Sequence, residues 1–279
     1  MRIAVASGKG GTGKTTVATN LAASLSGAVQ LLDCDVEEPN AHIFLKPENE
    51  DVQPAHTMVP AVDLEKCTCC GACDEICRFS AIAQFGKAIL TFPEMCHSCE
   101  GCVMVCPADA ITASTRQLGE IVRGTAGHID LIYGRLRVGE AMSPPLIDRV
   151  LELVDPGAIS IIDAPPGTSC PVIAAVRDAD FVLLVTEPTP FGHNDLVLAV
   201  EAVRMLELPF GIVVNRHDAA SPIIHDYAEK EGIPVMMEIP DKREIAENYA
   251  RGAMMVDALP EMKEQFQALF NGIQKRINE

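Results

Sequence analysis

The fold is decided by one short stretch, Gly8-Lys9-Gly10-Gly11-Thr12-Gly13-Lys14-Thr15-Thr16. It matches the phosphate-binding pattern G-x-x-x-x-G-K-[ST]. The apolar residues 3–6 before it predict a buried parallel strand. Residues 15–25 after it place Val17, Leu21 and Leu25 on one face of a helix. A Gly-rich turn that binds nothing is the alternative, but the preceding strand and following helix favour phosphate binding.

The residue types in this loop suit a nucleotide with Mg²⁺. Glycines let consecutive backbone N–H groups face one anion at the positive N-terminal end of a helix. Lys14 can reach the β- and γ-phosphates, and the Thr15 hydroxyl can bind Mg²⁺. We therefore expect the nucleotide to be held by Gly8, Lys9, Gly10, Gly11, Thr12, Gly13, Lys14, Thr15 and Thr16.

A second lysine, Lys9, directly follows Gly8. The run Lys-Gly-Gly-Thr-Gly-Lys-Thr-Thr resembles the deviant Walker A loop of the MinD/ParA/Mrp ATPases, which include the nitrogenase iron protein. The resemblance implies a P-loop ATPase that binds ATP and forms a homodimer on doing so. It also implies that Lys9 reaches the phosphates held by the other subunit. A solvated loop lysine is the alternative.

Polar residues at or just after the ends of other strands are expected to lie beside the same nucleotide. The resemblance implies that Asp35 positions the attacking water and also touches the Mg²⁺ shell. It implies that Asp163, at a Walker B-like strand end, organises this shell beside Thr15. Loop, cap or turn aspartates are the alternatives. It further implies that Asn215 reads the adenine edge and that Pro240 and Asp241 form a second base-side loop. The expected catalytic residues are Lys9, Lys14, Asp35 and Asp163.

Strand and helix patterns alternate along most of the chain, which predicts a doubly wound, mostly parallel α/β sheet covered on both faces. The expected strands are residues 3–6, 29–33, 129–133, 158–163, 181–186, 210–214 and 235–239. The expected helices are residues 15–25, 146–154, 196–206, 223–231 and 242–251. The tail, residues 259–277, has apolar side chains at helical spacing and is expected to dock on the core; a membrane-surface helix is the alternative.

Composition changes twice in the first half of the chain. Residues 46–63 are rich in Pro, Glu, Asp and Asn, and residues 112–127 are polar and punctuated by glycine, so both predict linkers or mobile loops. Between them lies a cysteine-rich segment. We therefore expect an ATPase domain in two parts, residues 1–58 and 115–279, with a small inserted domain at residues 59–114.

The cysteine spacing predicts that this insert binds two [4Fe–4S] clusters. The pattern C-x-x-C-x-x-C-x-x-x-C occurs twice, as in bacterial two-cluster ferredoxins, where the fourth cysteine of each run ligates the other cluster. Structural zinc is the alternative, although zinc sites usually use well-separated cysteine pairs. One cluster is expected on Cys67, Cys70, Cys73 and Cys106, and the other on Cys96, Cys99, Cys102 and Cys77.

Two further cysteines are less clearly assigned. Cys69 lies inside the first run and allows a shifted ligand register, but agreement with the second run favours Cys70. Cys170 follows Asp163 by the spacing at which the nitrogenase iron protein carries a cysteine that ligates a cluster shared across its dimer. A second such cysteine is not obvious here, because Cys34 lies on switch I, the loop after the second strand that the resemblance implies continues through Glu37, Glu38 and Pro39. A packed or redox-reactive thiol is the favoured interpretation of Cys170.

Composition limits the classes of function. The chain has 279 residues, 48% of them hydrophobic, and a net charge of −17. Such acidity argues against nucleic-acid binding through phosphate neutralisation. Neither a membrane-length apolar run nor a signal peptide is recognisable, so we expect a cytoplasmic protein that does not enter membranes. Nine of the eleven cysteines lie within residues 67–106, which suits metal binding in a reducing compartment.

The sequence thus predicts an ATPase coupled to an iron–sulfur module of α+β ferredoxin type. The favoured function is ATP-gated electron transfer through the two clusters to a protein partner. A carrier or assembly ATPase that passes a cluster or metal cofactor to a client is the first alternative. A positioning ATPase with a redox-sensing module is the second, and a purely structural role for the clusters also stays open.

Overall fold

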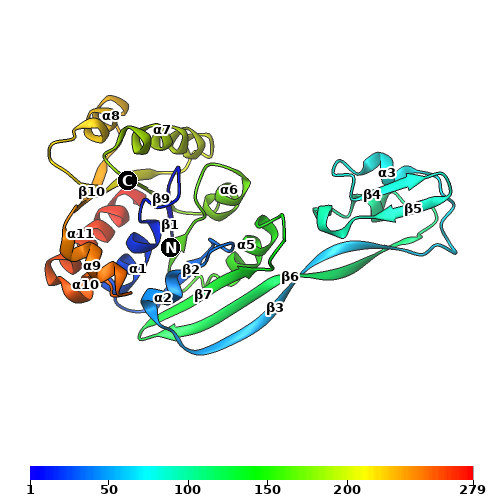
Figure 1. Ribbon diagram of the computed structural model, residues 1–279, viewed down its shortest axis with the longest axis horizontal. Coiled ribbons are helices and arrows are strands. Elements are labelled where there is room, and N and C mark those ends of the chain that lie inside the picture. The colour runs from blue at the N-terminus through cyan, green and yellow to red at the C-terminus, as the bar shows by residue number, and fades with distance from the viewer. Residues whose placement is uncertain (279) are drawn as a thin grey trace.

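The computed structural model describes residues 1–278, and its main element is a nine-stranded sheet of order β11-β10-β9-β1-β8-β2-β7-β6-β3 (Figure 1). All neighbouring strands from β11 to β7 are parallel, whereas β6 and β3 extend one edge in antiparallel pairing. The expected mostly parallel α/β fold is confirmed. The parallel strands are β1 (Arg2–Ala6), β2 (Val29–Asp33), β7 (Ile129–Leu136), β8 (Ile159–Asp163), β9 (Phe181–Thr186), β10 (Phe210–His217) and β11 (Val235–Pro240).

Helices cover both faces of the sheet because its central strands are apolar on both sides. In β1, Ile3 and Val5 contact one helical layer, while Ala4 and Ala6 contact the other. The first layer contains α1 (Lys14–Ser24), α2 (Ala41–Leu45), α9 (Arg243–Ala250), α10 (Met255–Ala258) and α11 (Pro260–Ile277). The second contains α5 (Pro144–Leu151), α6 (Cys170–Val176), α7 (Pro190–Met205) and α8 (Ile223–Glu231).

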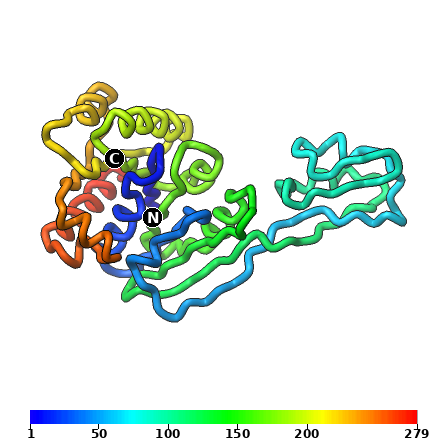
Figure 2. Tube along the Cα trace, in the orientation of Figure 1, coloured from blue at the N-terminus to red at the C-terminus, as the bar shows by residue number. Residues whose placement is uncertain are grey.

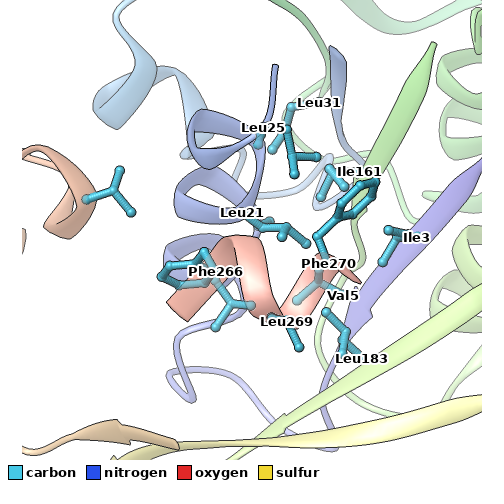
Figure 3. Packing of buried hydrophobic residues seen from close by; sticks show 14 of the residues in the cluster. Ile3, Val5, Leu21, Leu25, Leu31, Ile161, Leu183, Phe266, Leu269 and Phe270 are labelled. Atoms are coloured by element: carbon cyan, nitrogen blue, oxygen red, sulfur yellow. The ribbon is translucent and has the colours of Figure 1, made fainter. Parts of the chain in front are cut away.

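The C-terminal helix α11 packs on the core. Figure 3 shows Phe266, Leu269 and Phe270 of this helix beside Leu21 of α1, and all four side chains are buried. Burying an aromatic or leucine side chain stabilises a fold by about 1.5–3 kcal/mol, so this contact fixes the helix firmly. The apolar face is therefore used inside the protein. Among residues 1–278, no helix is both long enough and apolar enough to cross a bilayer.

The two segments expected to be linkers are instead the longest strands. β3 (Glu48–Val62) and β6 (Ile111–Ala126) pair with each other over nearly their whole length and form a ribbon that leaves the main sheet (Figure 2). The linker prediction for residues 46–63 and 112–127 was therefore wrong. The polar composition was misleading, because the first half of β3 is exposed and the strand lies at an edge of the sheet, where proline is tolerated.

The ribbon carries the cysteine-rich module at its far end (Figure 1). The predicted boundaries at 58/59 and 114/115 fall opposite each other inside the ribbon, where Met58 pairs with Thr115 and Val59 with Ser114. Beyond them lies a second, two-stranded antiparallel sheet with short helices. These elements are α3 (Ala72–Ile76), β4 (Ile82–Phe85), β5 (Ala88–Thr91), the 3-10 helix η1 (Pro93–Met95) and α4 (Gly101–Met104).

Candidate functional site

The Gly8–Thr16 loop joins the end of β1 to the start of α1, as its pattern predicted. Gly13 precedes α1 with φ 94°, a left-handed conformation that favours glycine. A Cβ at Gly13 would lie 2.3 Å from Asn215 Nδ2, and one at Gly8 would lie 2.0 Å from the Asp195 carbonyl oxygen. Both glycines are therefore required by close packing. The result is a loop whose backbone can wrap around an anion.

Asn215, near the end of β10, is hydrogen-bonded to this loop. Its side-chain amide donates a 2.7 Å hydrogen bond to the Thr12 carbonyl, and its Oδ1 accepts one from the Arg216 N–H. One amide hydrogen is thus engaged in holding the phosphate loop and is not directed to a base. Base recognition by Asn215 remains a prediction, and loop support is the contact that the geometry gives it.

Three carboxylates lie beside the loop. Asp163 and Asp33 are paired across neighbouring strands β8 and β2, and both are fully buried. Burial first, and the nearby charge of Asp33 second, raise the pKa of Asp163 well above its usual range. Within residues 1–278 neither Asp163 oxygen has a partner in full hydrogen-bond geometry, and the neighbouring Thr15 hydroxyl and Lys14 ammonium offset the pKa shift only in part. An orphaned buried carboxylate beside Thr15 fits a Mg²⁺ shell.

Asp33, at the end of β2, and Asp35, on switch I, occupy different environments. Asp35 is half-buried, and burial raises its pKa to about 6 although the Lys14 charge opposes the shift. The carboxylate of Asp33 accepts hydrogen bonds from the N–H groups of Asn40 and Ala41, at 2.9 and 3.0 Å, and so anchors the start of α2. Burial still raises the pKa of Asp33 to about 6. The sequence pattern had assigned no role of its own to Asp33.

Lys9 contacts an acidic residue of its own chain. Its Nζ lies 3.9 Å from Glu187 Oε2, and Arg216 pairs with the other oxygen of the same carboxylate. The Glu187 side chain is largely buried, whereas Lys9 stays partly accessible. For Lys9 to reach a second subunit it must first leave Glu187.

A pocket beside the loop brings together several predicted residues. Gly11, Gly13 and Thr16 face Asn215, Pro240 and Asp241 across it. Helix α9 closes the pocket with side chains that the sequence analysis missed. The sequence signal that could have identified these residues is Ile245 and Tyr249, which lie one helical turn apart. No residue of α9 is buried, so this apolar pair stays available, and an exposed aromatic side chain can stack on a nucleotide base. The missed lining residues are Arg216, Lys242, Ile245, Ala246 and Tyr249.

The first predicted cysteine set surrounds one small cavity in the module. That cavity is lined by all four thiols, together with Gly71 and apolar side chains from the ribbon end. A Cβ at Gly71, whose φ is 82°, would lie 2.7 Å from Gln84 Oε1, which is why glycine stands between the ligands. Four converging thiols in an otherwise apolar cavity fit a metal centre. They are Cys67, Cys70, Cys73 and Cys106.

The second predicted set gathers around the other half of the module. Cys102 lies near Cys96 and Cys99, and Cys77 packs against the small cluster that contains Cys96. The fourth cysteines of the two runs, Cys77 and Cys106, make equivalent hydrogen bonds. Cys77 Sγ accepts from Ala81 N and Cys106 Sγ accepts from Ala110 N, both at 3.3 Å. Burial opposes ionisation of Cys77, but four backbone N–H groups outweigh it and lower its pKa.

Three other cysteines are placed apart from these sets. Cys69 donates to the Lys87 carbonyl at 3.3 Å and does not line the four-thiol cavity. Cys34 is fully buried between strands, and burial raises its pKa well above the usual value. Cys170 is exposed at the first residue of α6, in a cleft that also contains His97 and Ser98 of the Cys96–Cys99 loop. Cys34 and Cys170 therefore do not form a ligand pair.

A family model for the CobQ/CobB/MinD/ParA nucleotide binding domain matches residues 3–255. The chain belongs to this family. Two uncharacterized proteins of Methanocaldococcus jannaschii are its relatives along nearly their whole length: one is 29% identical over 99% of this chain and 98% of its own. The other is 30% identical over 90% of each chain. The nucleotide-binding loop and its α/β setting are thus properties of the CobQ/CobB/MinD/ParA family.

Further matches come from named proteins and from solved structures. An iron-sulfur cluster carrier protein of Methanocaldococcus jannaschii is 24% identical over 99% of this chain and 84% of its own. Ferredoxin-1 of Chlorobaculum tepidum is 38% identical over only 17% of this chain, but 86% of its own. Among solved structures, the cell division ATPase MinD of Pyrococcus furiosus aligns with a TM-score of 0.62 at 20% identity, covering 98% of both chains. At that identity it shows the shared fold.

Proposed function

We propose that this protein is an ATP-hydrolysing iron–sulfur protein in which ATP-dependent association of two copies controls electron transfer to a partner protein. Its CobQ/CobB/MinD/ParA domain supports the nucleotide part of the proposal. The converging thiols and the partial match to Ferredoxin-1 support the iron–sulfur part. Bound at these sites, the clusters would supply one-electron redox chemistry, and Mg²⁺–ATP would supply a phosphoryl group for hydrolysis.

One observation supports the coupling: a series of polar contacts, connected through the 137–143 loop, runs from switch I to the cysteine module. Glu37, two residues after Asp35, accepts a 3.1 Å hydrogen bond from the buried Ser143 hydroxyl. Ser143 lies in the loop between β7 and α5, which also contains Glu140. The side chain of Glu140 is fully buried and pairs with both terminal nitrogens of Arg116 on β6.

Arg116 completes the connection to the cysteines. Its Nε donates a 2.9 Å hydrogen bond to the Pro93 carbonyl, and Pro93 begins the turn that ends immediately before Cys96. A movement of Glu37 would therefore be transmitted through the 137–143 loop and Arg116 to the Cys96–Cys102 run. Rigid contacts of this kind transmit a displacement when the element at one end has two positions, as switch loops do.

A second connection runs through the backbone. Asp33 holds the start of α2, and α2 leads directly into β3 of the ribbon. The Tyr133 hydroxyl donates to Glu50 at 3.0 Å and its ring stacks on His42, so the base of the ribbon is tied to β7 and α2. The ribbon that carries the module and the segment after Asp33 are therefore both attached to α2 and β7.

The remaining residues take the following parts in this proposal. Lys14 would neutralise charge on the transferred phosphoryl group, Thr15 would bind Mg²⁺, and Asp163 would complete its outer shell. Asp35 would orient the attacking water, and Lys9, once released from Glu187, would act on the phosphates of the second subunit. The two thiol sets would each hold one cluster, in an inserted domain that we place at residues 59–114.

A carrier function is the second candidate, because several relatives are named iron-sulfur cluster carrier protein. One experiment separates it from electron delivery. Reduced protein is mixed anaerobically with ATP and an oxidised acceptor protein, and both acceptor reduction and protein-bound iron are followed. Electron delivery predicts acceptor reduction at constant iron content. Iron loss that tracks ATP turnover, without acceptor reduction, would establish the carrier function instead.

A further inference from the structure

A group of two histidines and one glutamate lies outside both sites described above. His217 ends β10, His225 lies on α8 and Glu238 lies on β11, so three separate elements contribute one side chain each. One potential ligand atom from each residue lies within 4.8 Å of the other two. None of the three belongs to the nucleotide loop or to the cysteine runs.

Local backbone geometry brings these side chains together. The pairing of β10 with β11 shifts register between Val214 and His217, where β10 contains one residue more than β11. Arg216, directly before His217, adopts φ 51°, a left-handed conformation that is costly for a residue with a Cβ. Bulges of this kind redirect side chains and occur beside functional sites. Here the bulge turns His217 toward Glu238.

The donor atoms converge on the glutamate. His217 Nε2 lies 3.5 Å from Glu238 Oε2, and His225 Nε2 is hydrogen-bonded to Oε1 of the same carboxylate. The two imidazole rings face each other edge-on, with centroids 5.5 Å apart. Ligand atoms bound at about 2.0–2.1 Å in a tetrahedron are separated from one another by about 3.4 Å. His217 Nε2 and Glu238 Oε2 already have about this spacing, so metal binding requires only that His225 move out of its hydrogen bond with Glu238.

We propose that His217, His225 and Glu238 bind one divalent transition-metal ion of the zinc class. Two imidazoles favour such an ion over Mg²⁺ or Ca²⁺, which prefer oxygen ligands. Three protein ligands leave a fourth tetrahedral position for water. All three side chains are partly accessible, so the ion can enter from solvent.

The position of the group gives the ion a structural part to play. The His217 carbonyl accepts a 3.2 Å hydrogen bond from the Asp241 N–H, and Asp241 and Arg216 line the pocket beside the nucleotide loop. A metal bridging β10, α8 and β11 would fix the spacing of the two segments that form that pocket. Occupancy is therefore expected to tighten nucleotide binding without contributing a group to the reaction.

The test measures zinc uptake by cluster-loaded full-length protein under anaerobic conditions. Protein treated with a chelator is dialysed against Zn²⁺, and zinc and iron are counted in the same samples. Wild type should take up one zinc per chain. His225→Ala and Glu238→Gln should weaken uptake by at least about a hundredfold, because losing an outer partner of a ligand alone costs about 10–100-fold. His128→Ala, on the exposed β6–β7 turn, is the matched control and should bind like wild type.

X-ray absorption at the zinc edge identifies the ligands directly. Nitrogen and oxygen neighbours at about 2.0–2.1 Å, without sulfur at about 2.3 Å, would support the site. A sulfur shell would place zinc on the cysteines and overturn the proposal. Uptake by His225→Ala and the nearly isosteric Glu238→Gln that equals wild type, at equal iron content, would also overturn it. Neither readout depends on ATP hydrolysis or electron transfer.

Discussion

Arg116 and Glu140 form a two-pronged ion pair where the ribbon passes the 137–143 loop. The Glu140 side chain is fully buried and that of Arg116 nearly so, and Arg116 also holds the Pro93 carbonyl. The hydrogen bonds from Arg116 are the main effect on the pKa of Glu140; they outweigh the opposing effect of burial and lower it. Arg116 thus contacts both the 137–143 loop, through Glu140, and the turn before Cys96, through Pro93.

Arg116→Met should therefore destabilise the protein by about 3–5 kcal/mol, because it leaves the Glu140 charge buried without a partner. Urea unfolding at pH 7 measures the loss. The double variant Arg116→Met/Glu140→Met, which removes both charges, should recover most of it. Since the pKa of Glu140 is lowered in the fold, the stabilisation by the pair should be present above its unfolded pKa and disappear as pH falls. Equal stability of wild type and Arg116→Met would contradict the burial of this pair.

Lys14→Ala should reduce ATP turnover by about 10²-fold or more, as expected when one donor to the transition-state charge is lost. Lys263→Ala, an exposed lysine on α11, is the matched control and should hydrolyse ATP like wild type. Phosphate release under saturating Mg²⁺–ATP measures both. Near-normal turnover by Lys14→Ala would refute the assignment of Gly8–Thr16 as the catalytic phosphate loop.

Mg²⁺–nucleotide binding should weaken as pH falls below about 6. Burial raises the pKa of Asp35 to about 6, so below that value the free protein holds the proton that Mg²⁺ must displace. Each coupled carboxyl should cost about tenfold in affinity per pH unit below its pKa. Titration calorimetry between pH 5 and 8 measures the slope, and Asp35→Asn should show a shallower one. Because the nucleotide's own protonation is common to both proteins, identical slopes would exclude Asp35 from the linkage.

Cys70→Ser should lower bound iron from about eight toward four atoms per chain, since each cube holds four irons. Cys69→Ser is the matched control beside it and should leave iron unchanged, because Cys69 donates to the Lys87 carbonyl and lies outside the four-thiol cavity. Cys99→Ala should likewise remove up to half of the iron. Anaerobic iron and sulfide analysis decides these points. Loss of iron in Cys69→Ser with retention in Cys70→Ser would mean that the ligand register is shifted by one.

Lys9→Ala should abolish ATP-dependent dimerisation while leaving iron content intact. Glu187→Gln should have the opposite effect, because it releases Lys9 from the carboxylate that holds it within its own subunit. Analytical ultracentrifugation with a non-hydrolysable ATP analogue measures both. Unchanged dimerisation of Lys9→Ala would show that Lys9 is only a loop lysine.

The sequence predicts the central sheet well because its strands are short apolar runs that end at recognisable turns. Residues 29–33, 181–186 and 223–231 were assigned with their observed bounds. The helix predicted at residues 196–206 begins earlier, at Pro190, because Gly192 and the polar side chains after it hide the first turns. The short helices α2 and α6 were missed, since few residues carry their pattern.

Tertiary contacts explain what sequence reasoning missed at the sites. The ribbon strands bury little surface, so they lack the apolar alternation by which strands are recognised. The link from Glu37 to Pro93 joins residues far apart in sequence and has no local pattern. The same holds for the contact of Lys9 with Glu187. The phosphate loop and the cysteine runs could be predicted from the residues alone because their chemistry requires fixed spacing. The resemblance was needed to predict that Asn215, Pro240 and Asp241 lie beside the loop.

Communication between the nucleotide and the clusters is tested most directly by one measurement. The reduction potentials of the clusters are determined anaerobically with ADP and with a non-hydrolysable ATP analogue, in wild type and in Arg116→Met. We predict that the analogue shifts the potentials of wild type and that the shift is lost in Arg116→Met at equal iron content. Potentials of wild type that are identical with both nucleotides would contradict it.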